Sequence, residues 1–306
     1  MPVKLASNMA GLNLKNPILG ASGTFGYGTL YERFYDISVI GGFVTKALSL
    51  KPRAGNPAPR ICEAPGGMLN AIGLQNIGID RFVNQKLPKI KDKNLVIIAN
   101  FFGETVDEYV EVASRLNEVD GVHGLEMNIS CPNRNNEGLV FGASCKITED
   151  VVKACRKVTN KPLFVKLSPN VANIAEFAKV CEASGADGLS IINTLSGMAI
   201  DIRSRRPILA NVMGGLSGPA IKPVALRMVW QCYNAVKIPI FGIGGISCVE
   251  DVVEFILAGA SAVQIGSMNF VEPEICKTLV EELPDLLESL GVSDYRELIG
   301  ALDVGR

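Results

Sequence analysis

The sequence predicts a (β/α)8 barrel, the TIM-barrel fold, with an N-terminal β-hairpin and extended βα loops. The first indication is length: the 306 residues suit a barrel of about 250 residues with a few insertions. The second is that eight short apolar runs alternate with amphipathic segments, and the third is that no low-complexity linker separates them. Strands that are each followed by a helix must pair in parallel, and eight such units close into a barrel. We therefore expect one domain over residues 1–306; a doubly wound sheet is the alternative, but it does not usually supply eight units without a domain break.

The expected strands are β-branched or apolar runs of four to six residues. They are Pro17–Gly20, Phe43–Lys46, Leu95–Asn100, Gly124–Asn128, Leu163–Lys166, Gly188–Asn193, Ile240–Ile243 and Ala262–Gly266. Helical patterns fall at roughly residues 29–36, 79–90, 105–118, 148–158, 172–184, 219–236, 247–258 and 273–289. Before the first strand, Val3–Leu5 and Leu12–Leu14 around Ala10-Gly11 predict a small hairpin that caps the barrel floor.

Composition narrows the possible partners. Lys and Arg number 30 against 31 Asp and Glu, so the formal charge of −1 gives no reason to expect nucleic acid or another polyanion. The first residues lack the apolar core of a signal peptide, and no apolar run approaches the ~18 residues of a membrane span. We therefore expect a soluble cytoplasmic protein with no nucleic-acid partner and no membrane contact.

The eight cysteines do not predict a metal or iron-sulfur site. They include no C-x-x-C pair, and the single histidine, His123, lies near none of them. Four of them, Cys155, Cys181, Cys232 and Cys276, stand among apolar neighbours in helical patterns, so we expect them to pack as small core residues.

Polar residues close several of the apolar strands, and in a barrel the chemistry sits at the strand C-terminal ends. These residues are Lys46, Asn100, Asn128, Lys166, Asn193 and Thr194. A lysine there is costly to desolvate unless it meets an anion or an electron-rich ring. A single lysine could equally reach solvent through its own length, but two lysines and three asparagines on one rim predict a polar planar ligand.

Glycine-rich segments follow the seventh and eighth strands, where barrels commonly hold phosphate through backbone N–H groups. They are Gly242–Ser247 and Gly266-Ser267, and Gly214–Pro219 is read as a further glycine-rich loop before a helix. Glycines are also common at such turns for conformational reasons alone. Two of them at the expected strands predict a phosphate site.

Cys131 lies in the run Asn128-Ile129-Ser130-Cys131-Pro132-Asn133, just past an apolar strand. Because the chain has a single histidine, few side chains besides Cys131 can accept a proton near neutral pH. An inert buried thiol is the alternative, which the flanking amides and proline disfavour. Cys248, at a helix N-terminus, is the rival for a lowered thiol pKa, but no catalytic partner is visible near it.

Taken together, the motifs resemble class 1 dihydroorotate dehydrogenases, which are FMN-dependent barrels of pyrimidine biosynthesis. The resemblance is carried by Thr45-Lys46, Gly55–Arg60, Asn70–Asn76, Asn128–Asn133, Lys166–Pro169, Asn193-Thr194 and the two glycine loops. Within the class, Gly66–Asn76 is most similar to the catalytic subunit of the NAD-linked (1B) subclass. Alternatives are the fumarate-linked subclass, a dihydropyrimidine or dihydrouridine flavin oxidoreductase, and a non-catalytic barrel. Phe101 and Phe102 stand where the family usually has smaller residues.

The resemblance implies roles for individual residues. Cys131 is implied as the general base that removes a proton from C5 of dihydroorotate while hydride leaves C6 for flavin N5. Lys166 is implied as the cation that stabilises the reduced ring. The substrate set is Lys46, Asn70, Ala71, Ile72, Gly73, Leu74, Asn128, Asn193 and Thr194. The FMN set is Ser22, Lys46, Ala47, Asn100, Asn128, Lys166, Ile192, Gly218, Gly244, Gly245, Gly266 and Ser267.

The route of the electrons to NAD is expected to leave this chain. The sequence has no G-x-G-x-x-G fingerprint in a βαβ unit and no cysteine spacing for an iron-sulfur relay. The NAD-linked subclass passes electrons through a second protein that carries FAD and a [2Fe-2S] cluster. The resemblance therefore implies a homodimer of this chain within a heterotetramer.

Overall fold

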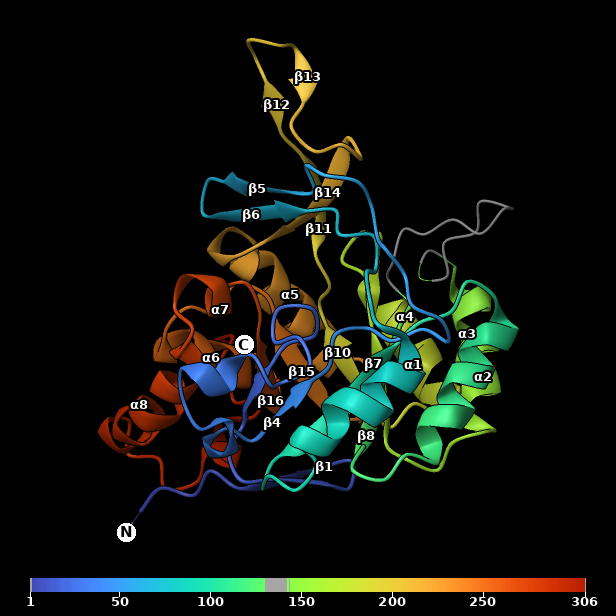
Figure 1. Cartoon of the computed structure of the whole chain (residues 1–306). Helices are drawn as coiled ribbons and strands as arrows, with labels where there is room; N and C mark the ends of the chain where they lie inside the picture. Colours follow the sequence, from blue (N-terminus) through green and yellow to red (C-terminus); the bar gives the residue numbers. More distant parts are fainter. Residues whose placement is uncertain (1, 130–141, 143, 306) are drawn as a thin grey trace.

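The structure, a computed structural model, describes residues 2–129, 142 and 144–305, and within them a closed barrel of eight parallel strands forms the centre of the molecule (Figure 1). The order around the barrel is β10-β15-β16-β3-β4-β7-β8-β9. Their bounds are β3 Ile18–Gly20, β4 Gly42–Val44, β7 Val96–Phe101, β8 Gly124–Asn128, β9 Leu163–Lys166, β10 Gly188–Ile191, β15 Ile240–Ile243 and β16 Ala262–Ile265. Every residue of these strands is buried, because helices cover one face and the barrel interior fills the other. The predicted (β/α)8 barrel is confirmed.

Helices surround the barrel where the periodic pattern predicts them, and side chains cap several of their first turns. Thr105 accepts a hydrogen bond from the Glu108 N–H at 3.2 Å, and Asn173 accepts one from the Ala175 N–H at 3.2 Å. The helices are α1 Gly78–Arg81, α2 Val106–Asn117, α3 Cys145–Arg156, α4 Ile174–Ala183, α5 Lys222–Tyr233, α6 Val249–Leu257, α7 Met268–Val271 and α8 Ile275–Ser289.

Two expected helices are wrong as continuous α-helices. Residues 29–36 contain only a short 3-10 turn, Tyr31–Arg33, followed by another at Ile37–Val39; no side chain caps the first turn. The pattern at 79–90 divides into α1, a π-helical turn at Phe82–Lys86 and a 3-10 turn at Leu87–Lys89. Pro88 has no N–H to continue the hydrogen-bond ladder, so the π-helical turn ends before it and Pro88 lies in the first turn of the 3-10 segment.

The N-terminal hairpin lies at the opposite end of the barrel from the strand C-termini (Figure 1). It pairs β1 Ser7–Met9 with β2 Leu12–Leu14, not Val3–Leu5 as expected. A two-residue turn with positive φ at Ala10 and Gly11 sets Met9 opposite Leu12 and fixes this register. Met9, Leu12 and Leu14 pack with barrel residues such as Phe164 and Phe241, so the floor of the barrel is sealed by apolar side chains.

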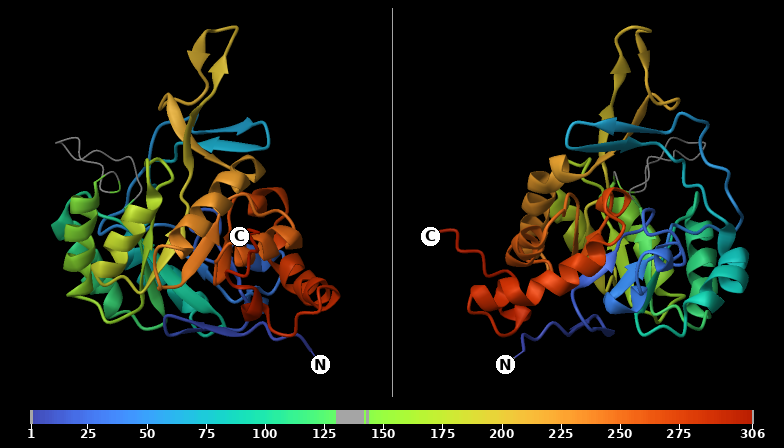
Figure 2. Two further views of the ribbon diagram at one scale, coloured as in Figure 1. Left: turned by 180° about the vertical axis from the view of Figure 1, so that it is seen from behind. Right: turned by 60° about the vertical axis from the view of Figure 1, so that its left-hand side comes forward.

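A second sheet covers the other end of the barrel, where the strands end. It has the order β11-β14-β6-β5 and comes from the long segments that follow β4 and β10 (Figures 1 and 2). Its strands are β5 Ile61–Ala64, β6 Gly67–Asn70, β11 Leu195–Met198 and β14 Met213–Ser217, and the hairpin β12 Ile200–Asp201 with β13 Arg206–Pro207 projects beyond it. These segments are the extended βα loops that the sequence predicts.

The expectation of a glycine-rich loop at Gly214–Pro219 is wrong for its first four residues, which belong to β14. The glycines there permit close contact: a Cβ on Gly215 would lie 2.0 Å from Thr194 Oγ1, and one on Gly214 would lie 2.6 Å from the Asn70 carbonyl oxygen. The glycines therefore bring the covering sheet against the predicted substrate residues.

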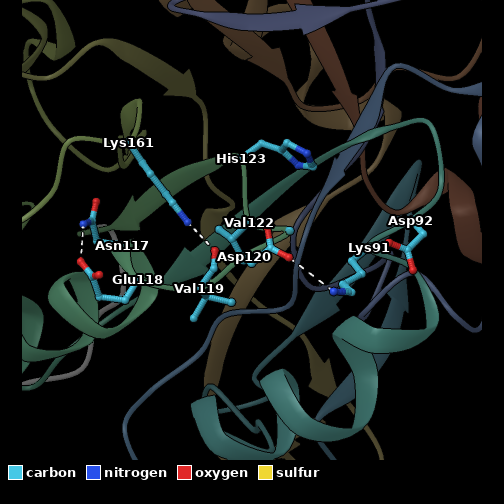
Figure 3. A pocket seen from close by; sticks show the side chains of 10 residues that line it. Lys91, Asp92, Asn117, Glu118, Val119, Asp120, Val122, His123 and Lys161 are labelled. Carbon is cyan, nitrogen blue, oxygen red and sulfur yellow. Dashed lines mark hydrogen bonds and ion pairs between the residues drawn. The ribbon is translucent and has the colours of Figure 1, made fainter.

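A cavity of about 480 Å³ lies at the floor side, lined by residues that include Asp120, His123 and Lys161 (Figure 3). His123 and Lys161 precede β8 and β9, so the cavity opens at the N-terminal ends of the strands. The Nδ1 atom of His123 accepts the N–H of Ile97 at 3.0 Å, and Lys161 donates to the carbonyl oxygens of Leu116 and Val119. This end of a barrel usually serves stability, and the interactions here fit that role. Among the described residues, no helix combines the length and apolar character needed to cross a bilayer.

Candidate functional site

A layer of polar side chains crosses the barrel interior just below the strand C-terminal ends. Its centre is Glu126 on β8, which is fully buried. Glu126 Oε1 accepts from Asn100 Nδ2 at 2.6 Å and lies 3.5 Å from Lys166 Nζ; Oε2 accepts from Ser190 Oγ at 2.5 Å and Gln264 Nε2 at 2.9 Å. Because Gln264 is on β16, on another side of the barrel, these contacts cross its interior. The layer brings together the predicted FMN residues Asn100 and Lys166.

Glu126 was not among the residues predicted from the sequence. The signal was present, since a lone carboxylate inside an apolar strand that is buried on both faces requires donors to compensate its burial.

The predicted substrate residues Asn128 and Asn193 come together at the rim. Asn128 ends β8 directly opposite Lys166 in the strand register. The Nδ2 atom of Asn193 donates a hydrogen bond to the Oδ1 atom of Asn128 at 3.3 Å. The Asn193 Oδ1 atom in turn accepts the N–H of Thr194 at 2.8 Å. Amides from the end of β8 and from the segment after β10, the two strands that flank β9, are thus fixed relative to one another.

Lys46 follows β4 and is half-buried. Burial lowers its pKa, and the nearby positive charge of Arg60 lowers it further. Arg60 is held by the carbonyl oxygen of Asn56 at 3.3 Å and by Gln75 Oε1 at 2.7 Å. Because Lys46 and Arg60 are both positively charged and lie near each other at the mouth of the barrel, an anion would bind there favourably.

The segment Asn70–Leu74 leaves the end of β6 beneath the covering sheet. Asn70 pairs with Gly215 of β14, and its side chain donates to the Gly215 carbonyl oxygen at 3.2 Å. Gly73 and Leu74 both have positive φ, and a cavity of about 270 Å³ is lined by Arg53, Ala54, Gly55, Asn56 and Gly73. Ala71 is buried, whereas Ile72 is half-buried. The predicted substrate segment therefore borders a cavity.

The predicted phosphate glycines gather at neighbouring strand ends. Gly244 and Gly245 follow β15 with positive φ, Gly266 follows β16, and Ser267 stands at the start of α7. A Cβ on Gly245 would lie 2.9 Å from the Gly218 carbonyl oxygen, so these two glycines lie close together; at Gly266 a Cβ would meet nothing within 4 Å. The open space at Gly266 leaves its backbone accessible.

An ion pair outside the predicted set holds this loop in place. The buried carboxylate of Asp251 accepts hydrogen bonds from Lys222 Nζ at 2.5 Å and from the N–H and hydroxyl of Ser247 at 2.7 and 2.9 Å. Although burial alone would raise the pKa of Asp251, the hydrogen bonds from Lys222 and Ser247 lower it below its usual range. The capping position of Asp251 in the first turn of α6 was a signal in the sequence for this role.

The remaining predicted cofactor residues lie close to the same strand ends. Ser22 lies in the turn after β3, buried Ala47 follows Lys46, and the Ile192 N–H donates to the Ile243 carbonyl oxygen at 3.0 Å. Of the two phenylalanines, Phe101 packs against Tyr109 of α2, on the helix side of the strand, and Phe102 lies under the Arg53 guanidinium. Phe101 therefore points away from the polar layer.

Cys131 lies outside the described residues. The rival thiol, Cys248, does stand at the N-terminus of α6, but burial raises its pKa, which argues against it as an activated thiol. Cys155, Cys181, Cys232 and Cys276 are fully buried, which confirms them as packing residues. Among the described residues, no group of three or more histidine, cysteine or acidic side chains is placed to hold a metal ion.

The chain is similar in sequence to proteins of a known family. The family model described as dihydroorotate dehydrogenase matches residues 4–287. A protein of Trichlorobacter lovleyi is 57% identical over 303 residues, which cover 99% of this chain and all of that protein; one of Geobacter sulfurreducens is 55% identical over 300 residues, 98% of each. Both are named dihydroorotate dehydrogenase B (NAD(+)), catalytic subunit.

The fold also matches a solved structure. The crystal structure of the Eimeria tenella dihydroorotate dehydrogenase in complex with ferulenol aligns with a TM-score of 0.81 and 23% identity, over 97% of this chain and 88% of that one. At that identity the match supports the barrel fold alone.

Proposed function

The chain belongs to the dihydroorotate dehydrogenase family and is an oxidoreductase that acts on dihydroorotate in pyrimidine biosynthesis, and we propose that it uses FMN and the residues gathered at the strand C-termini to do so. The observation that carries the proposal is the convergence of lysines and amides on one rim above a sealed barrel floor. The family relationship makes (S)-dihydroorotate the substrate and orotate the product.

The described residues fit an FMN ring. Asn100 Oδ1 is buried and has no hydrogen-bond partner among the described residues, so it is available to accept from a ligand N–H. Lys166 Nζ has three protons, and its 3.5 Å contact with Glu126 leaves donors for an electron-rich ring edge. Gly218, Gly244, Gly245 and Gly266 offer backbone N–H groups for the phosphate. The bound FMN would supply the hydride acceptor of the reaction.

The chain's own residues would bind the substrate and move its proton. Lys46, next to Arg60, attracts the carboxylate of dihydroorotate, while Asn70, Asn128 and Asn193 offer donors and acceptors to the amide-like edges of its ring. Cys131 is proposed as the base that takes the C5 proton as hydride leaves C6, a role that rests on the family motif. The covering sheet lies over the mouth (Figure 1), where exclusion of water around a bound substrate would strengthen each of these polar contacts.

The electron acceptor is proposed to be NAD, reached through a partner subunit. The term "catalytic subunit" in the names of the relatives supports a partner, and the NAD-linked subclass motif at Gly66–Asn76 supports an FAD and [2Fe-2S] protein in that role. A homodimer within a heterotetramer, a single domain over residues 1–306 and a cytoplasmic location remain predictions.

A flavin spectrum recorded before and after anaerobic addition of dihydroorotate tests the FMN proposal. We expect the purified chain to carry flavin absorption bands that bleach when dihydroorotate is added. A chain that binds no FMN would overturn the proposal. A chain that binds FMN but is bleached only by dihydrouracil or a dihydrouridine would point to the related flavin oxidoreductases.

A further inference from the structure

The carboxylate of Glu126 has no part in the function proposed above, yet it is the most heavily hydrogen-bonded acid of the barrel interior. It is 0% exposed and contacts four side chains from β7, β9, β10 and β16. Its partners there are an amide N–H, an ammonium, a hydroxyl and a second amide N–H, all of which donate. Glu126 therefore acts as an acceptor only, as a carboxylate does.

Stability alone does not explain an ion pair at this place. Burying a carboxylate and an ammonium carries a desolvation penalty that their attraction often does not exceed, and well-packed apolar residues usually do as well. Beneath it, towards the barrel floor, apolar side chains that include Phe164 and Phe241 pack together in one cluster, so this barrel accepts apolar packing. We therefore expect the Glu126–Lys166 pair to have a function at the candidate site, which lies above it at the strand C-terminal ends.

The geometry assigns such a role through Oε1. This one oxygen accepts from Asn100 Nδ2 and contacts Lys166 Nζ. An asparagine amide can otherwise turn either way, but an acceptor on one side holds the N–H₂ toward that side and leaves the carbonyl oxygen on the other. The result is a buried Asn100 Oδ1 that has no hydrogen-bond partner in the part of the chain that the structure describes.

We propose that Glu126 is a positioning residue for the flavin ring: it holds Asn100 as an acceptor and Lys166 as a donor, side by side. An acceptor beside a donor complements the pyrimidine edge of the flavin, where N–H and C=O groups alternate. This inference rests on the proposed FMN function. The negative charge of Glu126 also offsets the positive charge of Lys166, and so lowers the tendency of the bound ring to accept electrons.

The test replaces Glu126 with Gln and measures FMN affinity and the FMN midpoint potential, beside Lys166→Ala. A glutamine can donate to Asn100 Oδ1 and let the amide turn, so we expect the Kd of oxidised FMN to rise by about tenfold, the effect of one charged hydrogen bond. We expect the potential of Glu126→Gln to rise and that of Lys166→Ala to fall relative to the parent. Unchanged FMN affinity and potential in Glu126→Gln, or a shift in the same direction as in Lys166→Ala, would overturn the proposal.

Ser190→Ala is the matched control from the same layer, because it removes a donor to Oε2 and leaves both contacts of Oε1. We expect its FMN affinity to stay within about twofold of the parent, since the ring-facing groups keep their partner. An equal loss of FMN affinity in Ser190→Ala and Glu126→Gln would show that any disturbance of the layer has this effect, and would overturn the positioning role.

The double variant Glu126→Gln/Lys166→Met covers the case in which Glu126→Gln does not fold. Removing one partner leaves an uncompensated buried ammonium, whereas removing both does not. The double variant should therefore fold where Glu126→Gln does not, and should have the higher Tm where both fold; a double variant that also fails to fold, or whose Tm is no higher, would refute the charge coupling. If the parent protein bound no FMN, the proposed function would fail. If the parent bound FMN and Glu126→Gln had the same FMN affinity and midpoint potential as the parent, only this inference would be overturned.

Discussion

Asp251→Asn should loosen the loop that carries the proposed phosphate glycines. Both carboxylate oxygens of Asp251 accept: Oδ1 from Lys222, and Oδ2 from the N–H and hydroxyl of Ser247 and the N–H of Cys248. An asparagine accepts at one oxygen only, so its N–H₂ must face donors. The side chain is 5% exposed, so water cannot replace the lost partners.

The expected cost of this change is about 3 kcal/mol, the lower range for breaking a buried charge pair. With an unfolding entropy of about 2.1 cal/mol/K per residue, a chain of 306 residues has a total of about 0.6 kcal/mol/K, and its Tm falls by about 5 °C. Because the folded-state pKa of Asp251 is lowered, its contribution is complete above its unfolded-state pKa of about 3.9 and is lost as pH falls through the folded-state value. The Tm of Asp251→Asn and of the parent should therefore be compared near pH 7, where this contribution is complete.

Thermal denaturation followed by circular dichroism, with and without added FMN, is the assay. Glu254→Gln is the matched control: Glu254 contacts the same Lys222 Nζ at 2.8 Å but is 46% exposed, and such surface pairs contribute about 0–1 kcal/mol. Because a Cβ on Gly245 would lie 2.8 Å from Lys222, Asp251→Asn should also reduce the stabilisation by FMN. If Asp251→Asn lowered Tm no more than Glu254→Gln, the reasoning would be refuted.

Three further predictions concern the proposed base, the substrate anion and the barrel floor. Cys131→Ala should keep FMN and orotate binding but lose most dihydroorotate oxidation, and Cys131→Ser should retain a little activity at higher pH; parent-like turnover of the alanine variant would refute the base. Lys46→Ala should raise the KM for dihydroorotate more than it lowers kcat, because the substrate carboxylate loses its cation; steady-state kinetics checks this, and an unchanged KM argues against it. Burial lowers the pKa of His123, so its contribution to stability is complete above its unfolded-state pKa of about 6.5 and falls as pH decreases below that value; Tm measured from pH 5 to 8 should show this loss in the parent and not in His123→Gln.

The barrel could be predicted because its strands are continuous apolar runs, each followed by a helix, and this order admits few topologies. The covering sheet could not, because its strands β6 and β14 are short, rich in glycine and far apart in the sequence. Their pairing depends on a contact between Asn70 and Gly215 that no local pattern encodes. The segment at 29–36 was predicted as a helix because its periodicity is helical, but nothing caps its start.

The candidate site could be predicted only in part, because some of its contacts also join residues that are far apart in the sequence. Polar residues that end strands, such as Asn128 and Lys166, stand out against apolar runs. Glu126 stands out as a lone carboxylate in an apolar strand, but its Oε2 partners Ser190 and Gln264 lie 64 and 138 residues away in the sequence, so no local pattern shows what holds it. The assignments of Cys131 and of the NAD-linked subclass came from the family motif, because spacing alone cannot assign a substrate.

Turnover of the purified chain with three electron acceptors tests the central claim most directly. We predict that the chain alone oxidises dihydroorotate rapidly with an artificial acceptor and reduces NAD poorly, because NAD is reached through a partner protein. Rapid NAD reduction by the isolated, homogeneous chain would contradict the partner requirement, and rapid fumarate reduction would place the chain in the fumarate-linked subclass. Failure to oxidise dihydroorotate with any of the three would contradict the account as a whole.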